Sequence, residues 1–495
     1  MEKDTYDAVV VGSGPNGLAA AITLQREGLS VLLIEGKDII GGGMRSAELT
    51  LPGFLSDICS AIHPMAIASP LFSELPLEEH GLEWIHPPVL AAHPFDDGTA
   101  AVLKQSLSET SRLLGIDETN YLNLIAPVVK NWPQLVNDLL GPLGLPAHPL
   151  KMAAFGLKAL QPATRIIKKL DTQAAKGLFA GMAAHSVLPL NKLSTAAIAL
   201  VLLANGHLKG WPLPRGGSQQ LANALGNYFT AMGGTIQTDW QVRSIKDIPP
   251  AKAVLFDVGA KQLLQIAGGS FDPFYNYRLK KYRYGMGVFK VDWALDGPVP
   301  FTAAECREAG TVHLGGTWQH IARSEYLAAT GKISNEPFVL LTQQSLFDTG
   351  RAPEGKQVLW GYCHVPNGSM ADRTFAIEKQ IERFAPGFRD RIIARKTLNT
   401  MQLERYNPNY IGGDINGGMM NIGQLFARPM LKFSPYRTSA KGIYICSAST
   451  PPGGGVHGMC GYHAARQALS DIWPKRPPII TCLAGSFQSK IGHER

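Results

Sequence analysis

A glycine-rich turn near the start of this 495-residue chain constrains its fold more than any other feature. Residues 6–11 (YDAVVV) form an apolar, β-branched run, the turn 12–17 (GSGPNG) follows, and residues 18–27 have the pattern of a helix. A second apolar run, residues 30–34, leads directly into Glu35. This order of strand, glycine turn, helix, strand and acid predicts a Rossmann-type dinucleotide-binding unit.

Each part of this unit has a physical role. Gly12 permits the tight turn, Gly14 lets the backbone approach a pyrophosphate, and Gly17 lets the helix pack closely on the strand. The amides at the helix N-terminus are donors for the phosphates, and Glu35 is expected to accept a hydrogen bond from a ribose hydroxyl. The predicted contacts are Gly12, Ser13, Gly14, Pro15, Asn16, Gly17, Glu35 and Gly36. These residues alone do not distinguish NAD from FAD.

A second glycine turn, residues 41–46 (GGGMRS), follows the acid. It resembles the second fingerprint of flavin amine oxidases and carotenoid desaturases, and this resemblance implies FAD as the cofactor. In such proteins the arginine and the glycine amides face the pyrophosphate and ribityl part, which assigns Gly42, Gly43, Met44 and Arg45 to the cofactor. The alternative is an ordinary glycine loop with a surface arginine.

A matching signature lies near the other end of the chain. An apolar strand is expected at residues 442–446, then a proline- and glycine-rich loop, then a helix over about 462–472. The loop resembles the ending of carotenoid desaturases, although Ser447 replaces the usual glycine and Pro451 the usual histidine. The resemblance places this helix N-terminus under the pyrimidine end of the flavin, where its partial charge stabilises the reduced anion. It assigns Ser447, Ala448, Gly455, Val456 and His457 to the cofactor.

Taken together, nearly the whole chain resembles the phytoene desaturase-like FAD oxidoreductases, the superfamily of carotenoid desaturases and retinol saturases. The most similar subgroup is that of the pyridine nucleotide-disulfide oxidoreductase domain-containing protein 2. The stretches that carry this likeness are residues 57–64, 290–298, 407–415 and 447–458. A redox-active cysteine pair is nevertheless not expected, because none of the six cysteines is spaced as CxxC, and we expect reduced thiols.

The resemblance implies an α/β fold, with a discontinuous Rossmann-type FAD domain of the glutathione reductase/amine oxidase type and a substrate domain of mixed sheet and helices. A helix after Pro214 and paired strands at 234–239 and 242–245 would return to the FAD domain, with the backbone of Val242 against adenine. The predicted FAD domain is residues 1–75, 210–275 and 425–475. The substrate domain takes 76–209 and 276–424, and residues 476–495 form a tail.

Charge is scarce and unevenly placed. Only 17% of residues are charged, against about 25% in a typical soluble domain, which suggests an apolar cavity or a membrane contact. Residues 141–215 hold nine basic residues and one acid, a net charge of +8, whereas the rest of the chain has 38 of each. Pro162 should break this segment into two helices.

A basic amphipathic stretch flanked by uncharged runs can lie on an anionic membrane surface, and we expect this of residues 141–209, within the basic segment 141–215. The alternative is a solvated helix face over an ordinary core. Nucleic acid is not expected, since no reading motif or interleaved aromatic residues accompany the charge. The polar N-terminus and the lack of a long apolar run predict neither a signal peptide nor a membrane span, and therefore a cytoplasmic protein, peripheral at most on the inner face of a membrane.

The sequence does not identify a catalytic base. The candidates are His457 at the start of the last helix, His63, His185 between apolar runs, and Asp414 in a Gly-Gly-Asp loop. For each histidine a structural role is the alternative, and Asp414 can equally stabilise a turn. No spacing suggests a metal site.

Two classes of function remain open. The first is an FAD-dependent dehydrogenase that desaturates a hydrophobic, lipid-like or polyene substrate by hydride transfer to the flavin, with a saturase or isomerase using reduced FAD as its variant. The second is a flavin-containing binding or assembly protein with little turnover. A soluble amine oxidase is a weaker alternative, because the sequence does not place an aromatic cage for an amine.

Overall fold

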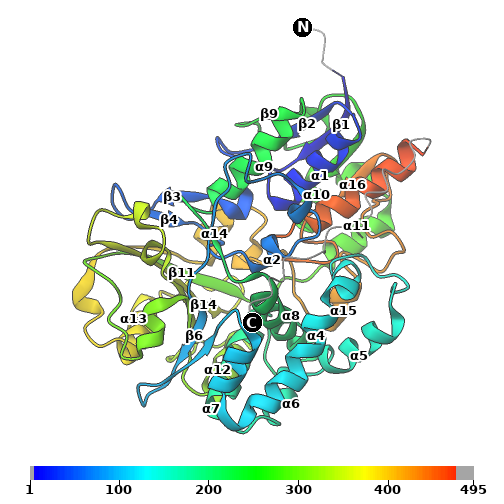
Figure 1. Ribbon diagram of the computed structural model, residues 1–495. Coiled ribbons are helices and arrows are strands. Elements are labelled where there is room, and N and C mark those ends of the chain that lie inside the picture. Colours follow the sequence, from blue (N-terminus) through cyan, green and yellow to red (C-terminus); the bar gives the residue numbers. More distant parts are fainter. Residues whose placement is uncertain (1–4, 475–495) are drawn as a thin grey trace, which may run out of the picture.

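The computed structural model describes residues 5–474 and builds them around two main sheets (Figure 1). The first sheet has five parallel strands in the order β16 (Ile443–Ile445), β10 (Ala251–Phe256), β1 (Tyr6–Val11), β2 (Val31–Ile34) and β9 (Thr235–Gln237). Its strands therefore come from three separate parts of the chain, all of them within the ranges predicted for the FAD domain. The predicted fold class is confirmed.

Helices cover both faces of this sheet because β1 is apolar on both sides. Ala8 and Val10 pack with α1 (Pro15–Arg26), α9 (Gln219–Ala231) and α16 (Met459–Ile472). Val9 and Val11 pack on the other side with α10 (Ala260–Ala267) and α11 (Pro273–Lys280). A strand buried on both faces is typical of a parallel sheet between two layers of helices.

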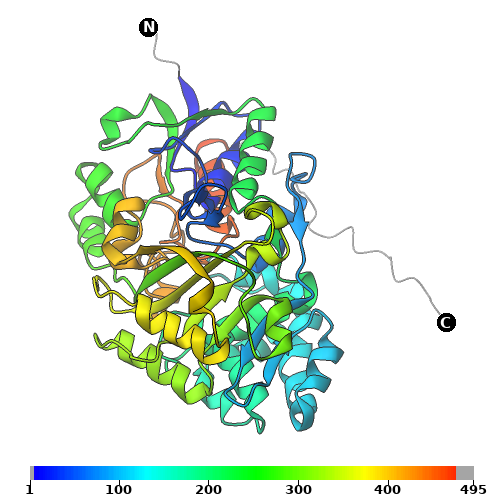
Figure 2. The ribbon, with the colours of Figure 1, turned by 90° about the vertical axis from the view of Figure 1, so that its left-hand side faces the viewer.

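The second sheet has seven strands and is mixed. Its order is β15 (Ile392–Leu398), β11 (Gly287–Leu295), β14 (Gln357–Val365), β13 (Val339–Thr342), β12 (Ala309–Leu314), β6 (Val89–Pro94) and β7 (Ala100–Leu103). Only the β12–β6 pair is parallel among these strands. One face packs on α13 (Thr374–Phe384), and Figure 2 shows this sheet with α13 on the side toward the viewer.

A layer of helices completes the part of the molecule that contains the mixed sheet (Figure 1). It contains α3 (Leu107–Leu113), α4 (Glu118–Leu139), α5 (Pro149–Ala159), α6 (Ala163–Ile167), α7 (Gln173–Ala184), α8 (Thr195–Lys209) and α12 (Trp318–Ala329). Pro162 separates α5 from α6, as its restricted backbone predicts. The basic segment thus holds more helices than the two expected.

Short elements link the two parts of the molecule. They are α2 (Pro64–Ile67), α14 (Thr400–Tyr406), α15 (Ile422–Phe426) and two small antiparallel pairs, β3 (Ser46–Glu48) with β4 (Leu55–Asp57) and β5 (Trp84–Ile85) with β8 (Leu213–Pro214). Within residues 5–474, no helix has both the length and the apolar character needed to cross a bilayer. The predicted tail, residues 476–495, lies outside the described residues.

One expected strand pair is wrong. Residues 242–245 form no strand, because the Asp247 carboxylate accepts hydrogen bonds from the amides of Arg243 and Ser244 at 2.8 and 2.9 Å. The Ser244 side chain in turn caps the single helical turn that follows. Such local bonds satisfy the backbone without a neighbouring strand. β9 pairs instead with β2.

Candidate functional site

The candidate site is a cavity of about 430 Å³ between the carboxyl ends of the parallel strands and the second sheet. One part is lined by loops of the five-stranded sheet and the other by the helical layer and the mixed sheet. A cavity outside the carboxyl ends of parallel strands is where such sheets bind ligands. We call the part lined by loops of the five-stranded sheet the dinucleotide part. The part lined by the helical layer and the mixed sheet is the inner compartment.

The two glycine turns meet backbone to backbone in the dinucleotide part. Gly12 has a φ of +99°, and a Cβ on Gly42 would lie 2.8 Å from the Cα of Gly14. Gly17 does not line the cavity, but a Cβ there would lie 1.9 Å from the carbonyl oxygen of Gly12. Its predicted packing role is therefore what the geometry requires. Pro15 is the first residue of α1, which starts the helix earlier than expected and points its N-terminus at the cavity.

Glu35 and Arg45 both line the cavity and bind each other. Arg45 Nη2 lies 3.0 Å from Glu35 Oε1, and Arg45 Nε donates to the carbonyl of Ile39. The other carboxylate oxygen of Glu35 accepts from the amide and the hydroxyl of Ser13. The pair thus holds the first glycine turn to the second. A ribose hydroxyl would share Glu35 with these partners.

Asp257 is a buried carboxyl that the sequence analysis missed. It follows β10 directly, and its Oδ2 accepts a hydrogen bond of 2.8 Å from the amide of Gly17 at the start of α1. A Cβ on Gly14 would lie 2.7 Å from the same oxygen. Burial, together with the charge of Glu35, raises the pKa of Asp257 to about 7. This acid therefore lies at the end of the helix where a pyrophosphate would bind.

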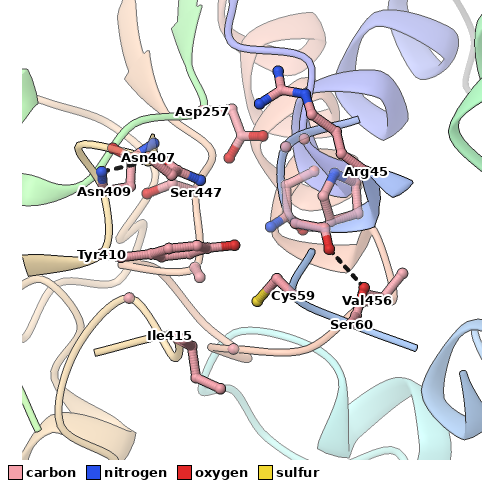
Figure 3. Close-up of a pocket in the computed structure, with 18 of the residues that line it drawn as sticks. Arg45, Cys59, Ser60, Asp257, Asn407, Asn409, Tyr410, Ile415, Ser447 and Val456 are labelled. Carbon is pink, nitrogen blue, oxygen red and sulfur yellow. Dashed lines mark hydrogen bonds between the residues drawn. The ribbon is translucent and has the colours of Figure 1, made fainter. Parts of the chain in front are cut away.

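The far end of the dinucleotide part is formed by the C-terminal signature and by loops after α14. Ser447, Ala448, Gly455 and Val456 line it, as does the segment 406–410. Figure 3 shows the Tyr410 ring extending toward Cys59 from the opposite wall, with Asp257 and Ser447 above it. Burial raises the pKa of the Cys59 thiol, so this group stays protonated.

These residues fit a dinucleotide such as FAD. The lining runs from Trp240 and Val242 past Glu35 and the two glycine turns to residues 454–456, just before α16. Close backbone approach at Gly14 and Gly42 leaves no side chain in the middle of the path. The α1 N-terminus and Arg45 supply positive potential there. Residues 5–474 hold no group of His, Cys, Asp or Glu that could bind a metal ion.

Besides Gly17, three predicted residues lie beside the cavity lining but not in it. Met44 is fully buried in the core between the sheet and its helices. The ring of His457 accepts a hydrogen bond of 3.0 Å through Nδ1 from the amide of Met459, the first residue of α16. The carboxylate of Asp414 accepts from the amides of Gly285 and Asn416 at 2.6 and 2.8 Å. His457 therefore caps a helix, and Asp414 shapes the loop that brings residues 415–417 to the cavity.

The inner compartment is apolar and aromatic. No carboxylate, lysine or arginine is among the described residues that line it, and the acids of the lining, Glu35 and Asp257, belong to the dinucleotide part. Its lining residues are Ile62, His63, Met65, His185, Val187, Leu202, Trp211, Thr311, Leu340, Thr342, Trp360 and Tyr362. Such a lining binds an uncharged ligand better than a charged one.

Alternation along three strands produces one wall of this compartment. Residues two positions apart on a strand point to the same face of a sheet. One face therefore carries Thr311 and His313 on β12, Leu340 and Thr342 on β13, and Trp360 and Tyr362 on β14. Trp360 and Tyr362 pack edge to face with ring centres 5.1 Å apart. The opposite face, with Val312, Leu341 and Leu359, packs into a separate core.

Of the two predicted histidines in the compartment, His63 is held by structural bonds. Its Nε2 lies 2.8 Å from the Ser218 hydroxyl, which donates to the carbonyl of Ser60. His63 Nε2 must therefore be the donor to Ser218. Burial lowers the pKa of His63 to about 4, which keeps the ring neutral.

His185 is placed differently. Its Nε2 lies 3.0 Å from Nε2 of His313 on β12, so the ring nitrogen left for the compartment is Nδ1. Burial and the nearby His364 lower the pKa of His185 to about 3. His364 in turn bonds Glu325 on α12 at 2.7 Å. The structure thus gathers buried polar groups at one point of an otherwise apolar wall.

Sequence reasoning also missed Trp240, Cys59 and the segment 406–410, which line the dinucleotide part, and the aromatic side chains of the inner compartment. A usable signal existed for Asp257, because it follows an apolar strand run directly and the carboxyl ends of parallel strands gather at one edge. No local signal marks the other residues. Loops far apart in the chain bring them together.

Comparisons with known proteins agree with this geometry. Residues 10–74 match the family model of the NAD(P)-binding Rossmann-like domain. The chain is 26% identical to pyridine nucleotide-disulfide oxidoreductase domain-containing protein 2 of Rattus norvegicus, over 95% of this chain and 94% of the relative. It is 22% identical to one of the subunits of limonene dehydrogenase from Castellaniella defragrans, over 95% and 96%. With the phytoene desaturase (lycopene-forming) of a Paracoccus species it shares 23% identity over 57% and 60%.

The crystal structure of an oxidoreductase from Methanosarcina mazei superposes on this chain with a TM-score of 0.62 at 17% identity, covering 94% of this chain and 100% of the other. That similarity shows a shared fold. The resemblance to phytoene desaturase-like FAD oxidoreductases, predicted from the motifs, is confirmed.

Proposed function

We propose that this chain is an FAD-dependent oxidoreductase that dehydrogenates an uncharged, lipid-like or polyene substrate. The observation that carries the proposal is the continuity of the cavity, in which a glycine-lined dinucleotide part opens into a compartment lined by apolar and aromatic side chains. Two relatives support it, because limonene and phytoene, the compounds in their names, are both apolar.

The bound FAD would supply an acceptor for a hydride from the substrate. The chain's own residues would bind and orient both partners. The α1 N-terminus and Arg45 hold the anionic part of the cofactor. Trp211, Trp360 and Tyr362 exclude water and offer flat surfaces to a hydrocarbon.

His185 is the ionisable group best placed to accept a proton from the substrate. It lines the compartment, its low pKa keeps the ring neutral at neutral pH, and Nδ1 is an acceptor when Nε2 donates to His313. The bond to His313 fixes the orientation of the ring. If conjugation stabilises the cation that hydride loss leaves on the substrate, the reaction would depend less on His185 as a proton acceptor.

The same cavity would serve a saturase or isomerase that uses reduced FAD. A charged amine is less suited to it, although the aromatic side chains that the sequence did not place are present. Transferring an ammonium group into a compartment without a carboxylate costs several kcal/mol, and cation–π contacts return about 0.5–2 kcal/mol.

The first prediction concerns the cofactor. Purified protein incubated with FAD and desalted is expected to keep the flavin absorption bands. Gly14→Ala is expected to lose them, because the added methyl group would lie 2.7 Å from the Asp257 carboxylate, in the path of the pyrophosphate. Gly156→Ala on α5, where the methyl group meets nothing within 4 Å, is the matched control and should keep them. A wild-type protein that takes up no flavin would refute the cofactor assignment.

Substrate class is tested by anaerobic reduction of the bound flavin. Apolar lipid and terpenoid fractions are expected to bleach the flavin bands, whereas polyamines and monoamines are not. Bleaching by amines alone would make the chain an amine oxidase. A flavin that stays oxidised with every donor, together with a co-purifying partner, would favour the binding or assembly protein.

A second prediction concerns His185. His185→Phe keeps an aromatic ring but removes the ring nitrogens, and it is expected to lower the rate of flavin reduction by an active fraction about tenfold or more, the low end for loss of an acid–base group. Flavin content should not change, since His185 lies in the inner compartment. The exposed His86→Gln is the control. An unchanged reduction rate in His185→Phe would rule out this role.

A further inference from the structure

We propose that α5, the loop before it and the basic residues that follow it form a docking surface for an anionic lipid bilayer. Apolar side chains at the centre and basic side chains along the flank make up this docking surface. Its members are Leu143, Leu145, Leu150, Leu157, Lys151, Arg165, Lys168 and Lys169. The inference is independent of the proposed reaction.

The first observation is an apolar stripe that faces solvent. On α5 the residues Leu150, Ala153, Ala154 and Leu157 are spaced i, i+3, i+4 and i+7, which puts them on one helix face. In a globular protein such a stripe normally packs on the core. Here all of these residues are exposed, Leu150 to 87% and Leu157 to 76%, while Phe155 and Ala159 anchor the opposite side.

The apolar surface continues into the loop before the helix. Leu145 is 99% exposed and Leu143 is half exposed. A lone exposed leucine needs no explanation, but a contiguous group on one helix and its leading loop marks an interaction site. Burying these leucines in lipid would remove them from water.

The charge around the stripe identifies the partner. Lys151 lies on α5 to one side of the stripe, and Arg165, Lys168 and Lys169 are exposed on and after α6. Nearby acids are few: Asp138 accepts the amide of Ala147, and Asp171 is the one acid of residues 141–215. Basic side chains beside an exposed apolar helix face suit anionic headgroups over acyl chains. A second copy docked through the same surface would bring like charges together.

The docking surface lies behind the wall of the inner compartment. α5 packs on α8, and α8 supplies Leu202 to the compartment. The core of this helical layer contains Phe155 of α5 and reaches Ile62 and Met65, which also line the compartment. A membrane-bound α5 would therefore place the apolar half of the cavity beside the lipid.

The test is sedimentation of the purified full-length protein with vesicles. With equal parts of phosphatidylcholine and phosphatidylglycerol at low salt, the wild type is expected to bind. Phosphatidylcholine alone or high salt should weaken binding, because the Coulomb attraction is lost or screened. Leu150→Ser with Leu157→Ser should lower the partition coefficient about tenfold or more, and Lys168→Gln with Lys169→Gln should remove most of the preference for anionic lipid.

Phe375→Ser on α13 is the matched control. Phe375 is 71% exposed, and Figure 1 places α13 on the other side of the molecule from α5. This variant should bind vesicles like the wild type, and all variants should keep their melting temperature, since the changed residues are exposed. Absence of wild-type binding at low salt would overturn the proposal. Self-association of the wild type without lipid would also overturn it if the double variant Leu150→Ser with Leu157→Ser abolished that association. The partner of the docking surface would then be a second copy of this chain.

Discussion

Arg351→Met is expected to lower the free energy of unfolding by about 3–5 kcal/mol, the usual cost of removing one partner from a buried ion pair. Arg351 is completely buried between Asp57 and Asp348. Its Nη1 lies 2.6 Å from Asp57, its Nε 2.8 Å from Asp348, and its Nη2 donates to the carbonyl of Pro214. Methionine has similar length but leaves two carboxylates without a cation in the interior.

The effect is large because this cluster joins the two parts of the molecule. Asp57 ends β4 and accepts from Ser46 and from the amide of Ser218, just before α9. Asp348 lies between β13 and β14 of the mixed sheet and accepts from the amide of Gly216. Loss of the arginine therefore weakens the contact between the part built on the parallel sheet and the part built on the mixed sheet.

The measurement is urea unfolding followed by circular dichroism. Lys356→Met, which breaks the exposed pair with Asp296, is the control and should cost about 1 kcal/mol or less. Burial alone would raise the pKa of Asp57, but Arg351 and three hydrogen bonds hold it below its ordinary value. This contribution to stability is present above about pH 4 and is lost as the pH falls further. Equal losses of unfolding free energy in Arg351→Met and Lys356→Met would show that the buried cluster contributes no more to stability than an exposed ion pair.

Asp257→Asn is expected to tighten FAD binding at alkaline pH by roughly tenfold to a hundredfold. The ionised Asp257 would stand beside an anionic pyrophosphate, and two like charges a few Å apart repel by about 1–4 kcal/mol at effective dielectric constants between water and 20. Its pKa of about 7 means that the group is neutral in acid and charged in alkali. Asparagine keeps the shape and removes the charge.

The pH dependence gives the sign of the effect. In the wild type, FAD affinity should be highest below pH 7 and fall as the pH rises through 7, because the pyrophosphate favours the protonated acid. The other charged groups at this end of the cavity are Glu35, which Arg45 neutralises, and Lys37. Asp257→Asn should show a nearly flat profile and bind like the wild type at low pH.

Fluorescence titration of the apoprotein with FAD at several pH values measures both effects. Asp247→Asn, an exposed acid that binds only local amides, is the matched control and should follow the wild-type profile. A wild-type affinity that does not change with pH would mean that Asp257 does not contact the pyrophosphate.

Local signals were sufficient for the dinucleotide part. The two glycine turns and the C-terminal loop were located correctly because close backbone approach and tight turns admit few residues other than glycine. Most residues chosen on this basis line the cavity. His457 does not, because a sequence places a histidine at a helix start but does not tell which way the ring points. Here the ring accepts a hydrogen bond from the amide of Met459 at the helix start.

The strand expected at residues 242–245 failed for a related reason. Its apolar and β-branched residues favour a strand, but Asp247 satisfies the neighbouring amides locally. Val242 still lines the cavity, since the loop passes the same edge of the sheet.

The sequence by itself determined the Rossmann-type unit and the two glycine turns that line the cavity, because these depend on backbone geometry that glycine and apolar strand residues encode locally. Only the tertiary structure decided what surrounds the reacting centre. It brought Asp257 to the α1 N-terminus, joined His185 to His313 and turned the Leu150 stripe toward solvent. The physical reason is that burial, pKa and side-chain partners depend on which distant segments pack together.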